Sequence, residues 1–363
     1  MSPGYDPMDD DSDSCSIMSG SGRYAPSMAS SATSYDWEMR SASPAPSVYS
    51  MTDSLVRAAF RHEFGRGINN YSEVYRLPAD DEEFERLDKQ HIMFMEVMGR
   101  YPPPMEEILA DSPDEHKSVV DLGCGSGSWI MDVARDFPHC SAVAVDLVPM
   151  QVRNMPPNCR SEVDDINLGL QHFYGVYNVA HARLVCSGVR DYKGFIDHIA
   201  RVLRPGGLIE LTEFDFAAYN KHKVKIVLNH KDANRCWIGR WMILAHEAVE
   251  QMGGEPDAAN HLRRWVGEND AFEDIVYRQF WFQTSPFRKG DDQETIRQNA
   301  IGAVMRDDIL AFLKSGRPLL LSSGMDEAVV NEVEANACRE LLEARTPSYI
   351  LVEKVYARKK LTT

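Results

Sequence analysis

Residues 119–129 read VVDLGCGSGSW. Two valines and an aspartate lead into glycines at every second position, Gly123, Gly125 and Gly127. Glycine adopts backbone conformations that other residues avoid and lets the backbone approach another group closely. We therefore expect a buried strand that ends in a turn against a ligand: a dinucleotide pyrophosphate, a phosphate cluster or another nucleotide-like molecule.

The sequence that follows alternates between strand and helix patterns. The run SWIMDVARDF (128–137) and residues 191–203 are amphipathic at helical spacing, and RPGG (204–207) is expected to stop the second helix. Short apolar runs typical of buried strands cover 117–123, 141–147, 160–165, 174–182 and 208–216. Such β-α-β alternation predicts an α/β fold with a doubly wound parallel sheet.

The flanking sequence divides into further parts. Residues 1–52 are rich in Ser, Asp, Met, Pro and Gly, and we expect them to be disordered. Residues 53–116 are expected to form a helical N-terminal segment, with an amphipathic helix over 81–99. This segment can fold over the site as a lid, or simply pack against the domain.

The main domain is expected to span residues 117–363. A helical insertion at about 217–270 interrupts the alternation, before the last two strands at 272–283 and 348–359. Helical sequence at about 293–345 joins these two strands, so we expect them to close the sheet with an antiparallel edge.

Composition excludes several functions. The net charge of −16 repels nucleic acid phosphates, so no direct nucleic acid binding is expected. The seven cysteines are odd in number and form no CxxC pair, so neither disulfides nor a metal site is expected. With no signal peptide and no apolar run long enough to span a membrane, we expect a cytoplasmic and/or nuclear protein.

The glycine spacing separates two kinds of nucleotide site. The dinucleotide fingerprint is G-x-G-x-x-G, whereas this chain has G-x-G-x-G. Asp121, two residues before the first glycine, would repel a pyrophosphate but would attract an ammonium group. A nicotinamide-dependent oxidoreductase is therefore disfavoured.

Acidic residues at the ends of the next two strands indicate which groups the rest of the ligand carries. Asp146 ends the second strand, where a carboxylate can accept both ribose hydroxyls. Asp164 and Asp165 compete for an adenine amino group, with Asp165 favoured, and Ile166 can cover the adenine face. Ammonium, ribose and adenine without phosphate fit S-adenosyl-L-methionine.

These residues resemble motif I and the later acidic motifs of class I S-adenosylmethionine-dependent methyltransferases over residues 117–216. More closely, the chain resembles the fungal LaeA-like methyltransferases. The matching positions are Tyr75, Leu77, Pro78, Asp80 or Asp81, Glu85, Arg86, Leu87, Gln90, His91, the GSGSW run, Asp146, Leu147, Pro149, Pro156, Pro157, Asn158, Asp164, Asp165, His181, Ala182 and Arg183. Cys124, Ser126 and Val148 depart mildly from that pattern.

The resemblance implies a Rossmann-like methyltransferase domain. It also implies that Asp121, Gly123, Gly125, Gly127, Trp129, Asp146, Leu147, Asp164, Asp165, Ile166 and His181 contact the cofactor. His181 can orient the acceptor or take its proton, or it can be hydrogen-bonded within its loop. A structural salt bridge is the favoured interpretation of Arg183, with carboxylate binding as the alternative.

Other candidates have structural alternatives as well. Glu213 and Asp215 are expected to face the cleft, as bases or as solvated strand ends, and Trp129 can pack on the cofactor or in the core. Trp237 and Trp241 form a helical stripe that is expected to be core, although it can line a pocket for a flat acceptor. Tyr75 and His91 belong to the possible lid.

We expect a methyltransferase that acts on a small-molecule, secondary metabolite. The alternative is a LaeA-like regulator of secondary metabolism or development that acts through nuclear protein complexes, with a protein acceptor or none. The partners are therefore a small-molecule acceptor or regulatory proteins, with no membrane.

Overall fold

The computed structural model describes residues 52–150, 154–228, 236–344 and 346–361. The predicted tail, residues 1–52, lies outside these ranges except for its last residue. None of the helices within the described ranges is long and apolar enough to cross a bilayer.

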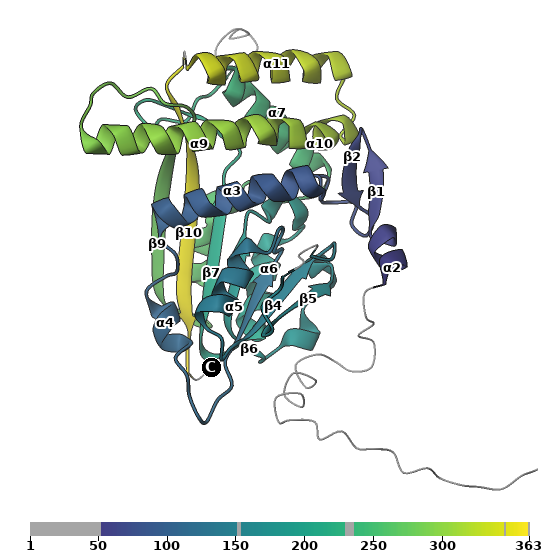
Figure 1. Cartoon of the computed structure of the whole chain (residues 1–363), viewed down its shortest axis with the longest axis vertical. Helices are drawn as coiled ribbons and strands as arrows, with labels where there is room; N and C mark the ends of the chain where they lie inside the picture. Colours follow the sequence, from purple (N-terminus) through teal and green to yellow (C-terminus); the bar gives the residue numbers. More distant parts are fainter. Residues whose placement is uncertain (1–51, 151–153, 229–235, 345, 362–363) are drawn as a thin grey trace, which may run out of the picture.

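An eight-stranded sheet forms the centre of the molecule (Figure 1). Its main path runs β5-β4-β3-β6-β7-β10-β8, and β9 pairs with the other edge of β10. The first five strands of this path are parallel to one another. They are β3 (Ser118–Leu122), β4 (Ser141–Asp146), β5 (Cys159–Val163), β6 (Tyr177–Arg183) and β7 (Leu203–Phe214). This arrangement confirms the predicted doubly wound fold.

The antiparallel edge is also confirmed. Strand β10 (Ser348–Lys359) runs antiparallel to β7, and β9 (Phe272–Gln283) runs antiparallel to β10. The sequence between them forms α9 (Gln293–Ser315), α10 (Arg317–Ser322) and α11 (Glu327–Glu343). The last two long strands are therefore adjacent in space although three helices separate them in the chain.

Helices cover both faces of the sheet, and β3 is buried along its whole length. Helices α5 (Ser128–Asp136) and α6 (Tyr192–Val202) follow the predicted amphipathic runs. The insertion contains the two-residue strand β8 (Tyr219–Asn220), α7 (Trp237–Gln251) and α8 (Ala258–Glu268). The short helix α4 (Pro104–Ile108) precedes β3.

Residues 204–207, RPGG, do not separate a helix from a strand as predicted. Helix α6 already ends at Val202, and RPGG lies inside β7 as an irregularity. The pairing with β6 jumps from Tyr177–Leu203 to Val179–Leu208, and Gly206 has a φ of +77°. The glycine allows the extra residues to loop out without ending the strand.

The N-terminal segment is not wholly helical. After α2 (Asp53–Ala58), strands β1 (Phe60–Glu63) and β2 (Arg66–Asn69) form a hairpin that the helical expectation for 53–116 missed. Its two-residue turn has φ values of +50° at Phe64 and +79° at Gly65. Positive φ at both positions matches the twist of a tight hairpin.

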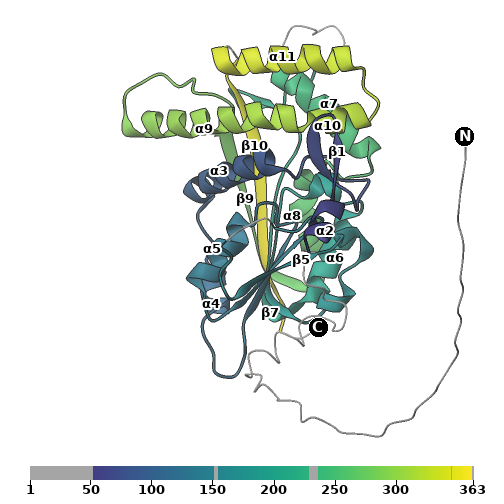
Figure 2. The same cartoon turned by 45° about the vertical axis from the view of Figure 1, so that its right-hand side comes forward.

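Helix α3 (Asp81–Met98) agrees closely with the predicted helix over 81–99. The Asp80 side chain caps it by accepting a hydrogen bond from the Glu83 N–H at 3.1 Å. Figures 1 and 2 show α3, α9 and α11 lying roughly parallel across one end of the sheet. That end holds the carboxyl termini of β3, β4, β5 and β6.

Candidate active site

The glycine turn follows β3, and its three glycines have the left-handed backbone conformation that favours glycine. Gly123, Gly125 and Gly127 have φ values of +79°, +55° and +78°. A Cβ atom on Gly123 would lie 2.5 Å from Val185 Cγ1, and one on Gly125 would lie 2.9 Å from Leu87 Cδ1. Gly123 and Gly125 line a large cleft, whereas Gly127 caps α5 outside it. The close packing is thus against the protein, with the turn's backbone open to the cleft.

Asp146 lies in this cleft at the end of β4. Its Oδ2 accepts a hydrogen bond from the Gly125 N–H at 2.8 Å, which joins the second strand to the glycine turn. Burial raises the pKa of Asp146 to about 6, although backbone N–H donors such as Gly125 oppose the shift. The position matches the predicted ribose-binding acid.

Asp164 and Asp165 lie beside each other after β5, and both line the cleft. Asp164 pairs with the His172 Nε2 at 3.0 Å. Asp165 caps the short helix η1 (Ile166–Leu168), because its Oδ1 accepts hydrogen bonds from the backbone and side-chain nitrogens of Asn167 at 3.0 and 2.8 Å. Both acids therefore have partners within the protein and also line the cleft.

Apolar side chains flank these acids. Leu147 follows Asp146 and Ile166 follows Asp165, and both are partly buried and line the cleft. That Ile166 covers the adenine face stays a prediction.

Asp121 and His181 form a buried pair at the ends of β3 and β6. His181 Nδ1 lies 2.7 Å from Asp121 Oδ1, and both residues are about 3% exposed or less. Register places them opposite each other on neighbouring strands. Asp121 was expected to face a ligand ammonium group, and the structure shows that it also orients His181.

Trp129 does not line the main cleft but lines a smaller cavity beside His181, and its expected contact with the cofactor stays a prediction. Its ring stacks on His181 with centroids 3.8 Å apart and also meets Tyr101 edge to face. The ring belongs to a buried hydrophobic cluster and supports His181 by this stacking.

Arg183 lies at the end of β6, and no described carboxylate forms the favoured salt bridge with it. Its Nη2 donates to His91 Nδ1 at 3.3 Å, and its guanidinium carbon lies 5.6 Å from the centre of the Phe94 ring. His91 in turn lies 3.2 Å from an Asp132 oxygen. This histidine of α3 therefore contributes to the site through Arg183.

Glu213 and Asp215 are fully buried and do not line the cleft, contrary to expectation. Glu213 Oε1 accepts hydrogen bonds from the Val185 and Cys186 N–H groups and from the Tyr192 hydroxyl. It holds the loop after β6 in place, and burial raises its pKa to about 7. Asp215 accepts from the Tyr219 hydroxyl.

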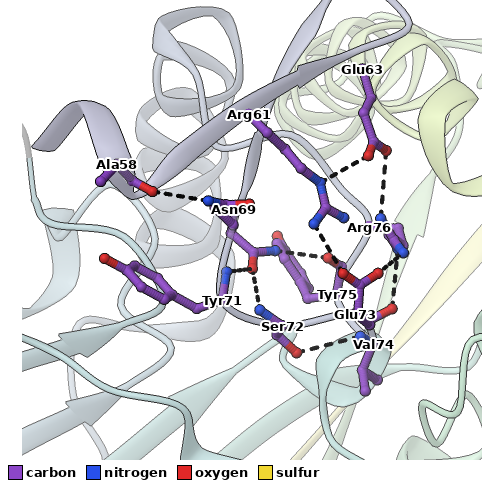
Figure 3. Close-up of polar contacts among 11 residues, drawn as sticks. Ala58, Arg61, Glu63, Asn69, Tyr71, Ser72, Glu73, Val74, Tyr75 and Arg76 are labelled. Carbon is purple, nitrogen blue, oxygen red and sulfur yellow. Dashed lines mark hydrogen bonds and ion pairs between the residues drawn. The ribbon is translucent and has the colours of Figure 1, made fainter. Parts of the chain in front are cut away.

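The N-terminal segment closes one side of the cleft with Tyr75, Leu77 and α3. Asn69 fixes the loop that carries Tyr75 (Figure 3). Its amide donates to the Tyr75 carbonyl at 2.8 Å and accepts from the Ser72 N–H at 2.7 Å. Tyr75 packs close to Gly188, and both residues line the cleft.

Helix α3 lines the cleft with charged and polar side chains as well as with the predicted apolar stripe. Arg86 donates to Glu83 Oε1 at 2.6 Å and to Asp308 Oδ1 of α9 at 2.8 Å. Gln90 donates to the other Asp308 oxygen at 3.0 Å. These four buried side chains link the two helices, and hydrophobic periodicity gave no signal for them.

An apolar chamber lies in the same cleft, beside the charged side chains of α3 and Asp308. Its walls come from β7 and the residues just after it, α7, α9 and β10, and they consist of Phe214, Phe216, Met242, Met305, Ile309, Phe312, Ile350 and Val352. Sequence reasoning missed all of them, because their patterns are those of ordinary core. Trp241 is fully buried against Phe312, as expected for core, and its helix reaches the chamber through Met242 instead.

Comparison with known proteins identifies related chains. A family profile described as "Methyltransferase domain" matches residues 91–268. A secondary metabolism regulator laeA of Coprinopsis cinerea is 45% identical over 302 residues, covering 82% of this chain and 74% of that protein. The protein-methionine methyltransferase laeA of Emericella nidulans is 32% identical over 49% of this chain and 46% of its own. Methyltransferase str2 of Strobilurus tenacellus is 27% identical over 76% of this chain and 93% of its own.

Proposed function

The chain belongs to the LaeA-like family of class I S-adenosylmethionine-dependent methyltransferases, and on that premise we propose that its acceptor is a small, largely apolar secondary metabolite. The observation that carries the proposal is the apolar chamber. It adjoins the buried Asp121–His181 pair and is lined by three phenylalanines, Phe214, Phe216 and Phe312. Such walls favour a compact, flat or apolar acceptor over a charged one.

The donor half of the cleft fits S-adenosylmethionine. Asp146 offers carboxylate oxygens to the ribose, and Asp164 and Asp165 offer oxygens near an adenine amino group. Leu147 and Ile166 provide apolar surface beside them. The bound cofactor supplies a methyl carbon that its sulfonium already activates, so the protein's main task is to hold donor and acceptor in line.

His181 is the residue best suited to remove a proton from the acceptor. Its Nδ1 lies 2.7 Å from Asp121 Oδ1, which fixes the orientation of the ring and leaves Nε2 as the ring nitrogen available to an acceptor. Trp129 fixes the plane of the ring by stacking on it. A base of this kind contributes only if the acceptor is a hydroxyl, an amine or an activated carbon.

The test is transfer of labelled methyl groups from S-adenosylmethionine. The purified protein is incubated with the small-molecule fraction or with the protein fraction of a fungal extract. We expect label in the small molecules with the wild type and none with Asp146→Asn. Asp270→Asn, an exposed control, should label as the wild type does. Label confined to the protein fraction would contradict a small-molecule acceptor.

A second candidate is a nuclear regulator that methylates a protein. The observation in its favour is that identity to a laeA regulator, at 45%, exceeds the 27% identity to str2. One relative bears the name protein-methionine methyltransferase. A methionine side chain is small and apolar, so it suits the same chamber. Label in the protein fraction, together with nuclear localisation of a tagged copy, would favour this candidate.

A further inference from the structure

A charged junction borders the apolar chamber where α3 meets α9. It consists of Glu83, Arg86 and Gln90 of α3 and Asp308 of α9, and all four residues line the cleft. The guanidinium carbon of Arg86 lies 5.5 Å from the centre of the Phe312 ring, which is one wall of the chamber. The junction is therefore in contact with the space in which we place the acceptor.

Asp308 interrupts the apolar face of α9. Met305, Ile309 and Phe312 of this helix recur at helical spacing and line the chamber. Asp308 lies on the same face, three residues after Met305 and four before Phe312. Its side chain is only 8% exposed. Because a carboxylate is costly to remove from water, a carboxylate at this position needs compensating partners.

The junction holds more negative than positive charge. Among the described residues, the cation within 4.0 Å of Glu83 and Asp308 is Arg86, at 2.6 and 2.8 Å. One guanidinium thus faces two carboxylates, whereas a bridge between the two helices needs only one. Burial raises the pKa of Asp308, although Arg86 and Gln90 oppose the shift. A cation that a ligand brings would supply the missing positive charge.

Asp308 also keeps capacity for hydrogen bonds. Its Oδ1 accepts one from Arg86 at 2.8 Å, and its Oδ2 accepts one from Gln90 at 3.0 Å. A carboxylate offers about four lone-pair sites, so about two of them stay available for a ligand. Both oxygens of Glu83, in contrast, accept from Arg86, and one also accepts from the Ser315 hydroxyl. Asp308 is therefore the carboxylate of the junction that can bind an acceptor.

We propose that the acceptor is an apolar amine whose ammonium group donates hydrogen bonds to Asp308 while its apolar body lies in the chamber. The inference rests on the proposed function, a small-molecule acceptor. An ammonium group brings one positive charge and three donors, so it matches both the excess charge and the available lone pairs. A carboxylate or phosphate at this end of the acceptor would meet like charge.

The proposal makes Asp308 a specificity-determining residue. The phenylalanine walls select the apolar body of the acceptor, and the junction selects its one charged end. The sign of the whole cleft agrees with this assignment, because the described residues that line it include more acidic residues than arginines.

The charge of the methylated product tests the proposal. The purified full chain is incubated with labelled S-adenosylmethionine and the small-molecule fraction of a fungal extract, and chromatography then removes the unreacted donor. We expect the labelled product to migrate as a cation in electrophoresis at about pH 7, since an aliphatic amine loses its proton only near pH 10. A neutral or anionic product would overturn the proposal, whichever atom receives the methyl group.

Substitution of Asp308 tests the residue itself. Asp308→Asn removes the charge and should lower labelling of the cationic product by about 10- to 100-fold in dilute extract, as for a lost charge-assisted hydrogen bond. The loss should shrink in concentrated extract, because the change weakens acceptor binding. Asp308→Glu should keep part of the activity. The matched control is Asp307→Asn, the exposed neighbour that pairs with Arg306, which should label as the wild type does.

Calorimetry with S-adenosylhomocysteine separates this role from a structural one. Asp308→Asn should bind this ligand within about threefold of the wild type, because Asp308 faces the acceptor chamber. If the variant does not bind it, the charge of the wild-type product decides alone. Equal labelling by Asp308→Asn and the wild type would overturn the proposal. Absence of label from all small molecules would instead contradict the proposed function.

Discussion

At the scale of single residues, we expect protonation of Asp146 to limit cofactor binding at low pH. An ionised carboxylate accepts two ribose hydroxyls better than a protonated one, and burial raises the pKa of Asp146 to about 6. We expect the affinity for S-adenosylhomocysteine to fall as the pH drops from 8 to 5. Asp146→Asn should bind at least about tenfold more weakly at pH 8 and show a flatter pH profile. Calorimetry at several pH values measures both, and an unchanged slope in the variant would assign the titration to another group.

Glu213 links pH to stability. With a pKa of about 7 when folded against about 4.3 when unfolded, the native state keeps a proton that the unfolded chain has already released. Stability from this group is therefore fully present below about pH 4 and is lost as the pH rises through 7. Glu213→Gln stays neutral and keeps an acceptor oxygen for the Val185 and Cys186 N–H groups.

The measurement for Glu213 is urea unfolding of the wild type and Glu213→Gln between pH 5 and 8. Relative to the variant, the wild type should lose about 1–3 kcal/mol of unfolding free energy over this range. Parallel curves for the two proteins would show that Glu213 does not change its protonation in this range.

At the scale of elements, the glycine turn and α3 are packed too closely for a larger residue. Gly125 has a φ of +55°, and a Cβ there would be 2.9 Å from Leu87 Cδ1. Gly125→Ala should therefore lower stability by about 1–3 kcal/mol and weaken cofactor binding. Leu87→Ala in the same chain removes the clash but not the strained backbone, so it should restore only part of the binding. If the double variant bound the cofactor as well as the wild type does, the positive φ at position 125 would not matter for binding.

Two arginines join α3 and α9 in different surroundings. Buried Arg86 meets Glu83 and Asp308, whereas Arg297 meets Glu96 at the surface. Arg86→Ala leaves buried carboxylates unpaired and should cost about 3–5 kcal/mol of unfolding free energy. Arg297→Ala should cost less than about 1 kcal/mol. Equal effects in urea unfolding would show that the Arg86 cluster is solvated rather than buried.

At the scale of the whole molecule, a net charge of −16 limits possible partners. A regulator could act by binding DNA directly, but the repulsion between like charges opposes this. We expect no mobility shift of a duplex of about 30 base pairs at about 0.15 M salt. A shift that disappears with rising salt would reveal a basic surface that the overall charge conceals.

The sequence predicts the residues that line the donor part of the cleft but not those that line the acceptor chamber. Strand ends carry a readable signal, since a glycine turn or an acid after an apolar run has few structural explanations, and Asp121, Asp146 and Asp165 all line the cleft. Phe312 and Val352 carry no such signal, because an apolar residue looks the same whether it faces a cavity or a core. The charged face of α3 was missed for a related reason. Glu83 and Arg86 look solvated until α9, more than 200 residues later, supplies Asp308.

The chamber walls come from segments that the donor site does not use. Helix α7 belongs to one insertion, and α9 lies in the long connection between β9 and β10. Changes in α7 or α9 would therefore reshape these walls while β3 to β6 and their acids stay in place. The architecture thus allows a change of methyl acceptor without a change of methyl donor.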